Sequence, residues 1–332
     1  MISRGKRIRR TGSQRGAALI AVFWLIAILS LLIFTTLRVL RNDVQLTISQ
    51  KKGFRARQLA EMGIAVGVNP ATKETDVLLL NRQLNDNEGY RVKIKGEGGK
   101  FNINAILAQL QQDELDTLLE DIFAQWLSGT DEAFADRDSR DLAGEVVDAL
   151  VDWVDADDLE RLHGAEQESY EEMGFMSYPF NRPFYSLDEL LLVRGMEQVV
   201  AAKRNWRDFF TIYSTGKLDM NEANAEAIAL ATGVDIEEAQ DLVEMRFGAD
   251  DMEDTLDDYK FGNLSEVFAV LGIVDDGILQ SRLSLNDNTK RIESIGTVGV
   301  GTPDAFSKKI ELVVRTQGRT PQILSREEVP LF

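Results

Sequence analysis

A single stretch near the start of the chain places the strongest constraint on its fold. Ala17 to Leu37 is a run of 21 residues without a charge, AALIAVFWLIAILSLLIFTTL. As an α-helix this run spans about 32 Å, which matches the hydrocarbon core of a bilayer. A buried helix of a soluble protein normally carries polar residues along one edge over such a length. The sequence therefore predicts one membrane-crossing helix at residues 17–37.

Composition excludes several classes of function. The 332 residues include no cysteine, so the chain forms no disulfide, thiolate zinc site or thiol nucleophile. His163 is the only histidine, which excludes paired-histidine metal sites, and the glycine after it indicates a surface loop rather than a catalytic base. The net charge is −18, and the six basic residues before Ala17 leave −24 on the remainder. Such an acidic body repels phosphate backbones, so we expect no nucleic-acid binding.

The residues just before the apolar run indicate how the chain is processed. A secretory signal places its small-residue cleavage site after the apolar stretch, whereas Arg15-Gly16-Ala17 comes before it. Basic residues flank the run on both sides, so the charge count does not set the orientation. The basic leader, glycine and retained apolar helix resemble the class III signal of type IV pilins and type II secretion pseudopilins. This resemblance implies that a prepilin peptidase cuts between Gly16 and Ala17, methylates Ala17 and leaves the body in the periplasm.

One position separates this chain from most members of that family. They carry a glutamate at the fifth mature residue, which here is Ala21. The K-type minor pseudopilins typically lack this acid. The absence of this glutamate therefore favours a resemblance to the K-type, whose other features lie further along the chain.

Hydrophobic periodicity predicts an α+β fold. No proline occurs between the apolar run and Asn69-Pro70, so we expect the helix to continue to residue 68. Alternation at residues 90–95, 291–298 and 308–315 predicts three strands of one small antiparallel sheet, and the segment between them has mostly helical periodicity. The expected segments are a leader (1–16), a transmembrane helix (17–37), its periplasmic continuation (38–68), a pilin-like α+β domain (72–104 and 285–320) and an inserted all-α domain (105–284).

The inserted segment contains an internal repeat. Gly99–Asn104 recurs as Gly216–Asn221, and Ser186–Met196 recurs as Asn263–Ile273. Between these two blocks, Glu145 and Asp148 with the Ala-Asp-Asp at 156–158 recur 93 residues later. Three blocks in the same order favour a duplication over chance matches.

Acidic residues concentrate in one part of the insert. Residues 113–172 contain 21 Asp and Glu but only three basic residues. Most of these acids suit a solvated face. Asp155, Asp157 and Glu166 stand at positions 1, 3 and 12 of an EF-hand, but Leu159 and Glu160 break that loop, so only an irregular calcium site is compatible with the spacing. A solvated face and a metal site both remain open on the residues alone.

The same region carries the most specific resemblance. Asp152-Trp-Val-Asp155-Ala-Asp157, then Gly164-Ala-Glu166 and Tyr170 resemble the K-type minor pseudopilins of type II secretion, as do Leu187–Met196 and Gly216–Asn221. The resemblance implies calcium in the helical insert, and we predict Asp152, Asp155, Asp157 and Glu166 as ligands. Asp158 and Glu168 are alternatives. It also implies a capping role at the pseudopilus tip that starts assembly and supports export, with no catalytic activity. The implied partners are the I-type and J-type minor pseudopilins, the major pseudopilin, the prepilin peptidase and the inner membrane.

Two other functions are suggested by parts of the sequence. Paired carboxylates could act as general acid and base, but nothing in the acidic run singles out a carboxyl in an apolar pocket. The repeated Leu-x-Glu-Leu-x-x-Val-x-Gly units could instead be helix-hairpin-helix modules of a competence-type pseudopilin that binds nucleic acid. Six acids between Asp250 and Asp258 disfavour that interpretation. A glycine that ends a helix explains Gly195 and Gly272 without a ligand.

Overall fold

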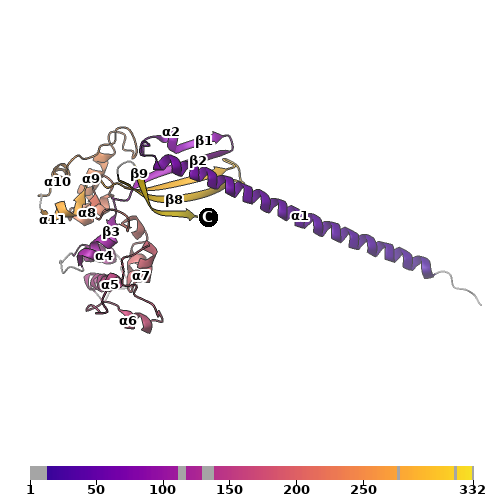
Figure 1. Ribbon diagram of the computed structural model, residues 1–332, viewed down its shortest axis with the longest axis horizontal. Coiled ribbons are helices and arrows are strands. Elements are labelled where there is room, and N and C mark those ends of the chain that lie inside the picture. Colours follow the sequence, from indigo (N-terminus) through magenta and orange to yellow (C-terminus); the bar gives the residue numbers. More distant parts are fainter. Residues whose placement is uncertain (1–12, 111–116, 129–137, 275–276, 318–319, 331–332) are drawn as a thin grey trace, which may run out of the picture.

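The computed structural model describes residues 13–110, 117–128, 138–274, 277–317 and 320–330, with side chains from Ala18 onward except those of residues 110 and 317 (Figure 1). One long helix projects away from a body made of two parts, a sheet and a group of short helices. This is the α+β architecture that the sequence predicts: a long N-terminal helix, a small antiparallel sheet and helices inserted between its strands.

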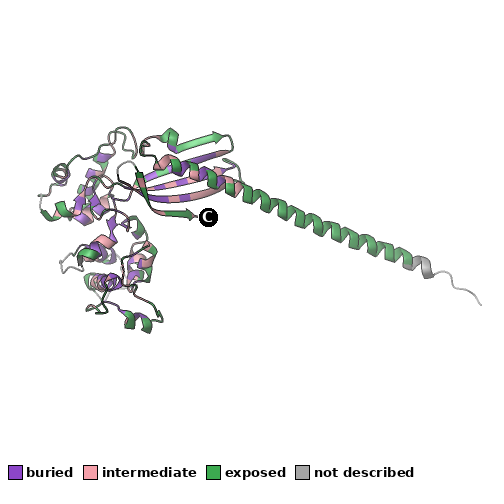
Figure 2. Cartoon of the chain, in the orientation of Figure 1, coloured by how far each residue is buried: buried purple, intermediate pink, exposed green. Residues whose placement is uncertain are grey.

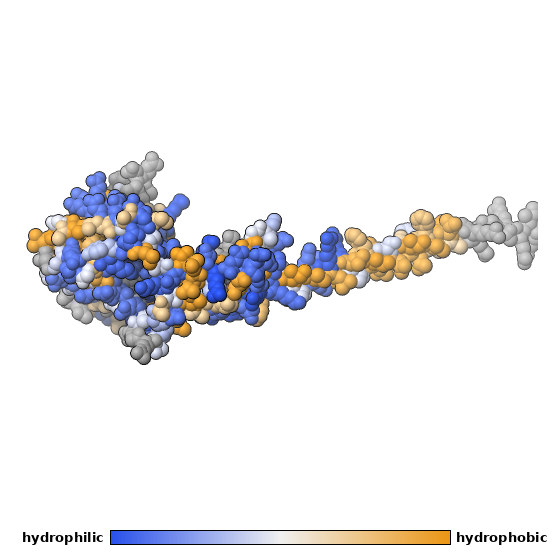
Figure 3. All heavy atoms as spheres, turned by 90° about the horizontal axis from the view of Figure 1, so that it is seen from above, coloured by the Kyte–Doolittle hydropathy of each residue, from blue (hydrophilic) through white to orange (hydrophobic). Residues whose placement is uncertain are grey.

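Helix α1 runs from Ser13 to Val68 without a break. It ends just before Asn69-Pro70, which holds the first proline after the apolar run and is the end that the sequence predicts. Within the described residues it is the one helix long and apolar enough to cross a membrane, and its most apolar window has a mean hydropathy of 2.8 and is not buried at all. The apolar half of α1 stands clear of the body in Figures 2 and 3. Bare apolar surface of this extent requires a lipid or protein environment.

A five-stranded antiparallel sheet covers the other half of α1, in the order β1-β2-β7-β8-β9. The three predicted strands are confirmed as β2 (Glu88–Gly96), β7 (Thr289–Val298) and β8 (Phe306–Gln317). Two edge strands, β1 (Asn81–Asn85) and β9 (Thr320–Val329), were not predicted, and β9 carries the sheet past residue 320. A short helix, α2 (Val77–Leu80), precedes β1.

Glycines let α1 lie unusually close to the sheet. A Cβ at Gly63 would stand 2.2 Å from Ser294 Oγ, and one at Gly296 of β7 would stand 2.1 Å from the carbonyl oxygen of Ala56. Side chains such as Leu59 and Ile292 then form a core between helix and sheet. We call α1 from residue 53 onward, together with α2 and the five strands, the sheet module.

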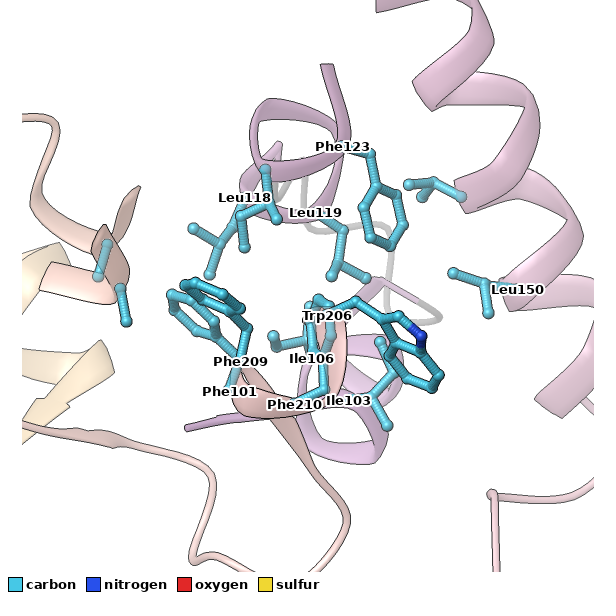
Figure 4. Close-up of a cluster of buried hydrophobic side chains, with 14 of the residues drawn as sticks. Phe101, Ile103, Ile106, Leu118, Leu119, Phe123, Leu150, Trp206, Phe209 and Phe210 are labelled. Atoms are coloured by element: carbon cyan, nitrogen blue, oxygen red, sulfur yellow. The ribbon is translucent and has the colours of Figure 1, made fainter. Parts of the chain in front are cut away.

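The chain between β2 and β7 forms a second body, which we call the helical module (residues 101–284 as described). Its elements are β3 (Phe101–Asn102), α3 (Ile103–Leu110), α4 (Leu118–Ser128), α5 (Ser139–Val154), α6 (Gln167–Glu172), the 3₁₀ helix η1 (Leu187–Leu192), α7 (Met196–Ala202), η2 (Trp206–Asp208), β4 (Phe210–Thr211), β5 (Leu218–Asp219), α8 (Ala225–Thr232), α9 (Ile236–Arg246), α10 (Leu264–Val270), α11 (Gly277–Arg282) and β6 (Leu283–Ser284). Its core is aromatic, with Phe123, Trp206, Phe209 and Phe210 gathered between the helices (Figure 4).

Matching hydrogen bonds support the internal repeat. Asn104 uses its side-chain amide to donate to the carbonyl of Phe184 and to accept from the N–H of Phe184, both at 2.9 Å. Asn221, its counterpart, makes the same pair of bonds with Phe261, at 3.1 and 2.8 Å. Each copy also begins with a two-residue parallel strand pair, β3 with β4 and β5 with β6. The asparagine in each copy therefore ties the start of the unit to the segment before its last helix.

Candidate metal centre

The candidate centre is built where α5 ends. Asp138 caps the start of α5 by accepting from the N–H of Arg140, and the apolar face of the helix is buried down to Trp153 and Val154. Asp152 shares that buried end and is completely shielded from solvent. Its Oδ2 accepts from the N–H of Arg161 at 3.2 Å, whereas its Oδ1 has no hydrogen-bond partner. A buried carboxylate oxygen without a partner is costly, so this position requires an explanation.

Two further carboxylates also have buried oxygens without a hydrogen-bond partner. Asp155 follows the last turn of α5 and has one buried oxygen, Oδ1, without a partner. Glu166 precedes α6 and is 4% exposed, and neither of its carboxylate oxygens is hydrogen-bonded. Three predicted ligands therefore contribute four orphaned buried oxygens to one region of the helical module.

The charges of these groups oppose one another. The pKa of Glu166 is raised to about 7, first by burial and then by the charges of Asp152, Asp155, Asp158 and Asp157. The pKa of Asp155 is raised to about 6 by burial and by Asp157 and Asp152. Burial also raises the pKa of Asp152. Carboxylates that raise each other's pKa in this way are stabilised as anions when a cation lies among them.

The fourth predicted ligand, Asp157, lies differently. It is exposed, and its Oδ1 accepts from the N–H of Leu159 at 2.9 Å, which closes a local turn. Of the two alternatives, Asp158 is exposed but lines a cavity of about 170 Å³ together with Glu166. Glu168 lies exposed in the first turn of α6 and does not line that cavity.

Sequence reasoning missed Asn181, which lines the same cavity as Glu166 and Asp158. Its side-chain oxygen Oδ1 is buried without a partner, and its backbone has a φ of 49°. Asparagine tolerates this left-handed conformation better than most residues. The only sequence signal was its place in the turn-like Tyr178–Tyr185 segment, which predicts a turn but not an oxygen directed toward an acidic loop.

The local sequence around Glu166 follows from close packing. A Cβ at Gly164 would stand 1.8 Å from Asp152 Oδ2, so only glycine fits there. Ala165 is fully buried, and Arg194 donates to the carbonyls of His163 and Gly164. Tyr170 accepts from the N–H of Arg194 and packs edge-on against Trp153, with ring centres 5.5 Å apart. These contacts hold the segment 163–166 against the end of α5.

The types of donor atom at this centre suit a hard cation, but the side chains do not yet form a complete coordination geometry. In the described part of the chain, no three carboxylates stand close enough together to hold a metal ion as the side chains are placed. The orphaned donors are all oxygens, which is the preference of calcium rather than of zinc or copper. Binding would therefore require side-chain rotation, which exposed Asp157 and Asp158 can make at little cost.

Comparison with known proteins finds a family that part of the chain resembles. Residues 99–205 match the family model described as type II secretion system (T2SS), protein K. Over these residues the chain is similar to that family. A putative type II secretion system protein K of Escherichia coli (strain K12) is 26% identical over 198 residues, which cover 56% of this chain. That match spans 59% of the relative, less than two thirds of its length.

A solved structure has the same fold. The chain resembles a chain in the crystal structure of the GspK-GspI-GspJ complex from the enterotoxigenic Escherichia coli type 2 secretion system, with a TM-score of 0.57 and 16% identity. The superposition covers 88% of this chain and 99% of the other. The K-family match at 99–205 begins at the first repeat block and includes all four predicted metal ligands.

Proposed function

We propose that the chain is a K-type minor pseudopilin that caps the tip of a type II secretion pseudopilus. The observation that carries the proposal is the likeness over 88% of this chain to a member of a GspK-GspI-GspJ complex. The match to the protein K family at residues 99–205 supports it independently of the fold. By this likeness, the partners of the chain are an I-type and a J-type minor pseudopilin, with the major pseudopilin below them. In this role the chain starts pseudopilus assembly and supports export of folded proteins, without catalysis.

The membrane anchor follows from α1. Its apolar half is fully exposed and long enough to cross a bilayer once. We propose that a prepilin peptidase cuts between Gly16 and Ala17 and methylates Ala17, which leaves a single-pass inner-membrane protein with its body in the periplasm. Both residues belong to the backbone of α1, whereas residues 1–12 of the leader lie outside the described residues.

Two features favour the tip over the shaft. A glutamate at the fifth mature position would need a partner in hydrocarbon, and Ala21 removes that need. The helical module lies at the end of the molecule farthest from the start of α1 and extends to one side of the sheet (Figure 1). Such a side projection is difficult to accommodate between close neighbours along a shaft, but it is unobstructed at the end of one.

We propose calcium as the ligand of the centre at the end of α5. Asp152, Asp155 and Glu166 supply orphaned buried oxygens, and Asp157 supplies an exposed one. Bound calcium would neutralise carboxylates that otherwise repel one another and would tie α5 to the loop before α6. Its role is structural, because it stabilises the helical module and takes no part in a reaction.

Copy number and partner binding test the proposal together. The chain should co-purify with an I-type and a J-type minor pseudopilin as an equimolar complex. Gold or fluorescent labelling of the helical module on isolated pseudopili should mark one end of each filament once. Labels spaced along the filament would refute the capping role, even if the ternary complex forms.

A further inference from the structure

The two modules do not share a hydrophobic core. Among the described residues, the apolar cluster of the helical module runs from Phe101 to Leu283, and that of the sheet module includes Ala56 to Ile94 and Ile292 to Val314. No residue belongs to both. The chain crosses between the modules twice, at residues 97–100 and 285–288. Whatever fixes their relative orientation is therefore polar.

The two crossing segments are tied to each other and to the modules. Glu97 donates its N–H to the carbonyl of Thr289 at 2.8 Å, and Asp219 donates its N–H to the carbonyl of Gly98 at 2.7 Å. Asp219 Oδ2 in turn accepts from the N–H of Asp287 at 2.6 Å. From the sheet side, Arg315 of β8 donates to the carbonyl of Tyr213 at 2.5 Å.

Glu97 is the side chain at the centre of this junction. It is 1% exposed, and its Oε1 accepts from Arg291 Nε of β7 at 2.5 Å. Its Oε2 accepts from Thr211 Oγ1 of β4 at 2.5 Å, and Lys100 Nζ lies 3.7 Å away. One carboxylate therefore joins a strand of the sheet module to a strand of the helical module.

The electrostatics keep Glu97 charged. Burial alone would raise its pKa, but the charges of Lys100 and Arg291 and the hydrogen bonds from Arg291 and Thr211 outweigh burial and hold the pKa below its ordinary value. Arg291 also pairs with Glu311 of β8 at 3.1 Å, so its position within the sheet does not depend on Glu97 alone. A buried ion pair with all its partners in place is directional, because moving either side leaves an uncompensated charge.

Beside Glu97 and Arg291 the modules face each other across a cavity, which a further ion pair crosses, Lys260 to Glu74 at 3.7 Å. This polar cavity of about 570 Å³ is lined on the sheet side by Glu74, Lys93 and Lys95 and on the helical side by Glu222, Arg246 and Asp254, among others. An open polar cleft does not resist rotation in the way that a packed core does. Resistance to rotation must therefore come from the polar contacts of the junction, among which Glu97 is the most buried side chain that bonds to both modules.

We propose that Glu97 is an ionic clamp that fixes the direction in which the helical module projects from the membrane helix. The chain of contacts is continuous. Helix α1 packs on β7 through Gly63 and Gly296, β7 carries Arg291, Arg291 binds Glu97, and Glu97 binds Thr211 of the helical module. The clamp makes helix, sheet and helical module move as one body.

Distance measurements between spin labels test the clamp, and the absence of cysteine makes labelling clean. Labels at Gln83→Cys and Gln125→Cys report the distance between modules in the full chain in lipid nanodiscs, because both side chains are exposed, on β1 and α4. Labels at Gln125→Cys and Gln240→Cys report distances within the helical module. Glu97→Gln, which keeps the shape and removes the charge, should broaden the first distribution and leave the second unchanged.

Glu311→Gln is the matched control. It removes the other carboxylate of Arg291 but spans no module boundary, so the inter-module distribution should stay narrow. Thr211→Val keeps every charge and removes one hydrogen bond, so it should broaden that distribution less than Glu97→Gln does, and it carries the test if Glu97→Gln does not fold. A narrow distribution in both Glu97→Gln and Thr211→Val, or equal broadening in Glu311→Gln, would overturn the proposal.

Discussion

Gly164 is the residue on which the loop of the candidate centre depends most directly. A methyl group there would collide with the Asp152 carboxylate, 1.8 Å from Oδ2, and Asp152 is buried with no room to move freely. We expect Gly164→Ala to destabilise the protein by about 2 kcal/mol, as overpacking of a buried site does. Urea unfolding measures this change.

Gly144 supplies the control for that substitution. It lies inside α5, and a Cβ there would meet nothing within 4 Å. Because alanine is favoured over glycine inside helices, Gly144→Ala should stabilise the protein by about 0.5–1 kcal/mol. If the two variants shift stability equally, the close approach of Gly164 to Asp152 has no energetic weight.

Calcium dependence is the second prediction at the residue scale. A ligand that binds only the folded state stabilises it by about 2.7 kcal/mol at a hundredfold excess over Kd. We expect a chelator to lower the melting temperature of the body from residue 53 onward, which keeps the part of α1 that packs on the sheet, and Asp155→Asn with Asp157→Asn to abolish that difference. Of the two single variants, Asp155→Asn should reduce the calcium-dependent stabilisation more. Asp155 has a buried oxygen without a partner, whereas Asp157 is exposed and bonded to Leu159. Identical melting curves with calcium and with chelator would return these acids to a solvated face.

The raised pKa values predict a pH dependence with a definite sign. Glu166, at about 7, and Asp155, at about 6, hold protons in the folded state at a pH where the unfolded chain has released them. Folding then takes up protons, so the stability of the metal-free protein should fall as pH rises from about 4.5 to 7, by on the order of 1 kcal/mol. Thermal melts in metal-free buffer at pH 5 and pH 8 measure it. Saturating calcium should remove the difference, and Glu166→Gln should reduce it without calcium.

At the scale of elements, the contact between α1 and β7 depends on Gly296. A Cβ there would stand 2.1 Å from the backbone oxygen of Ala56 and 2.4 Å from the backbone nitrogen of Ala60, neither of which can rotate away. We expect Gly296→Ala to cost about 3 kcal/mol. Gly63→Ala should cost less, because the nearest atom is the Ser294 hydroxyl, which can change rotamer. Denaturant unfolding ranks the two, with Gly262→Ala as the unobstructed control.

Elements with a strong local pattern were predictable from sequence, and those without one were not. Strands β2, β7 and β8 alternate apolar and polar residues because one face of each packs on α1. β1 is exposed along its whole length and β9 lies at the other edge, so neither shows the alternation that reveals a half-buried strand. The repeat could be recognised in the sequence because Asn104 and Asn221 make the same hydrogen bonds in their two copies, which requires the same residue type at both positions.

The candidate site divides in the same way. Asp152, Asp155 and Glu166 were predictable from their crowding at the end of an apolar helix, and the structure buries oxygens of all three without partners. Gly195 was expected to end a helix, yet it starts α7 in a left-handed conformation after η1. Asn181 could not be predicted, because it reaches the cavity from a loop distant in sequence, and tertiary packing alone brings it to Glu166.

At the scale of the whole molecule, the position of the membrane helix determines what processing leaves behind. The apolar window is exposed over its whole length and continues without a break into the helix that packs on the sheet. Cleavage between Gly16 and Ala17 would remove the basic leader and keep the anchor, so the body stays attached to the membrane through one rigid helix. N-terminal sequencing of the membrane fraction should therefore begin at Ala17.

Variants at the two ends of the apolar run distinguish this outcome from ordinary secretion. Gly16→Leu should block cleavage and leave the leader attached, while the protein remains in the membrane. If the chain caps the tip, Ala21→Glu should leave cleavage unchanged but reduce assembly or gain nothing. A carboxylate in hydrocarbon is costly when no subunit above it supplies a partner. A soluble form that begins after Leu37 would contradict the retained anchor, and improved assembly by Ala21→Glu would contradict the tip position.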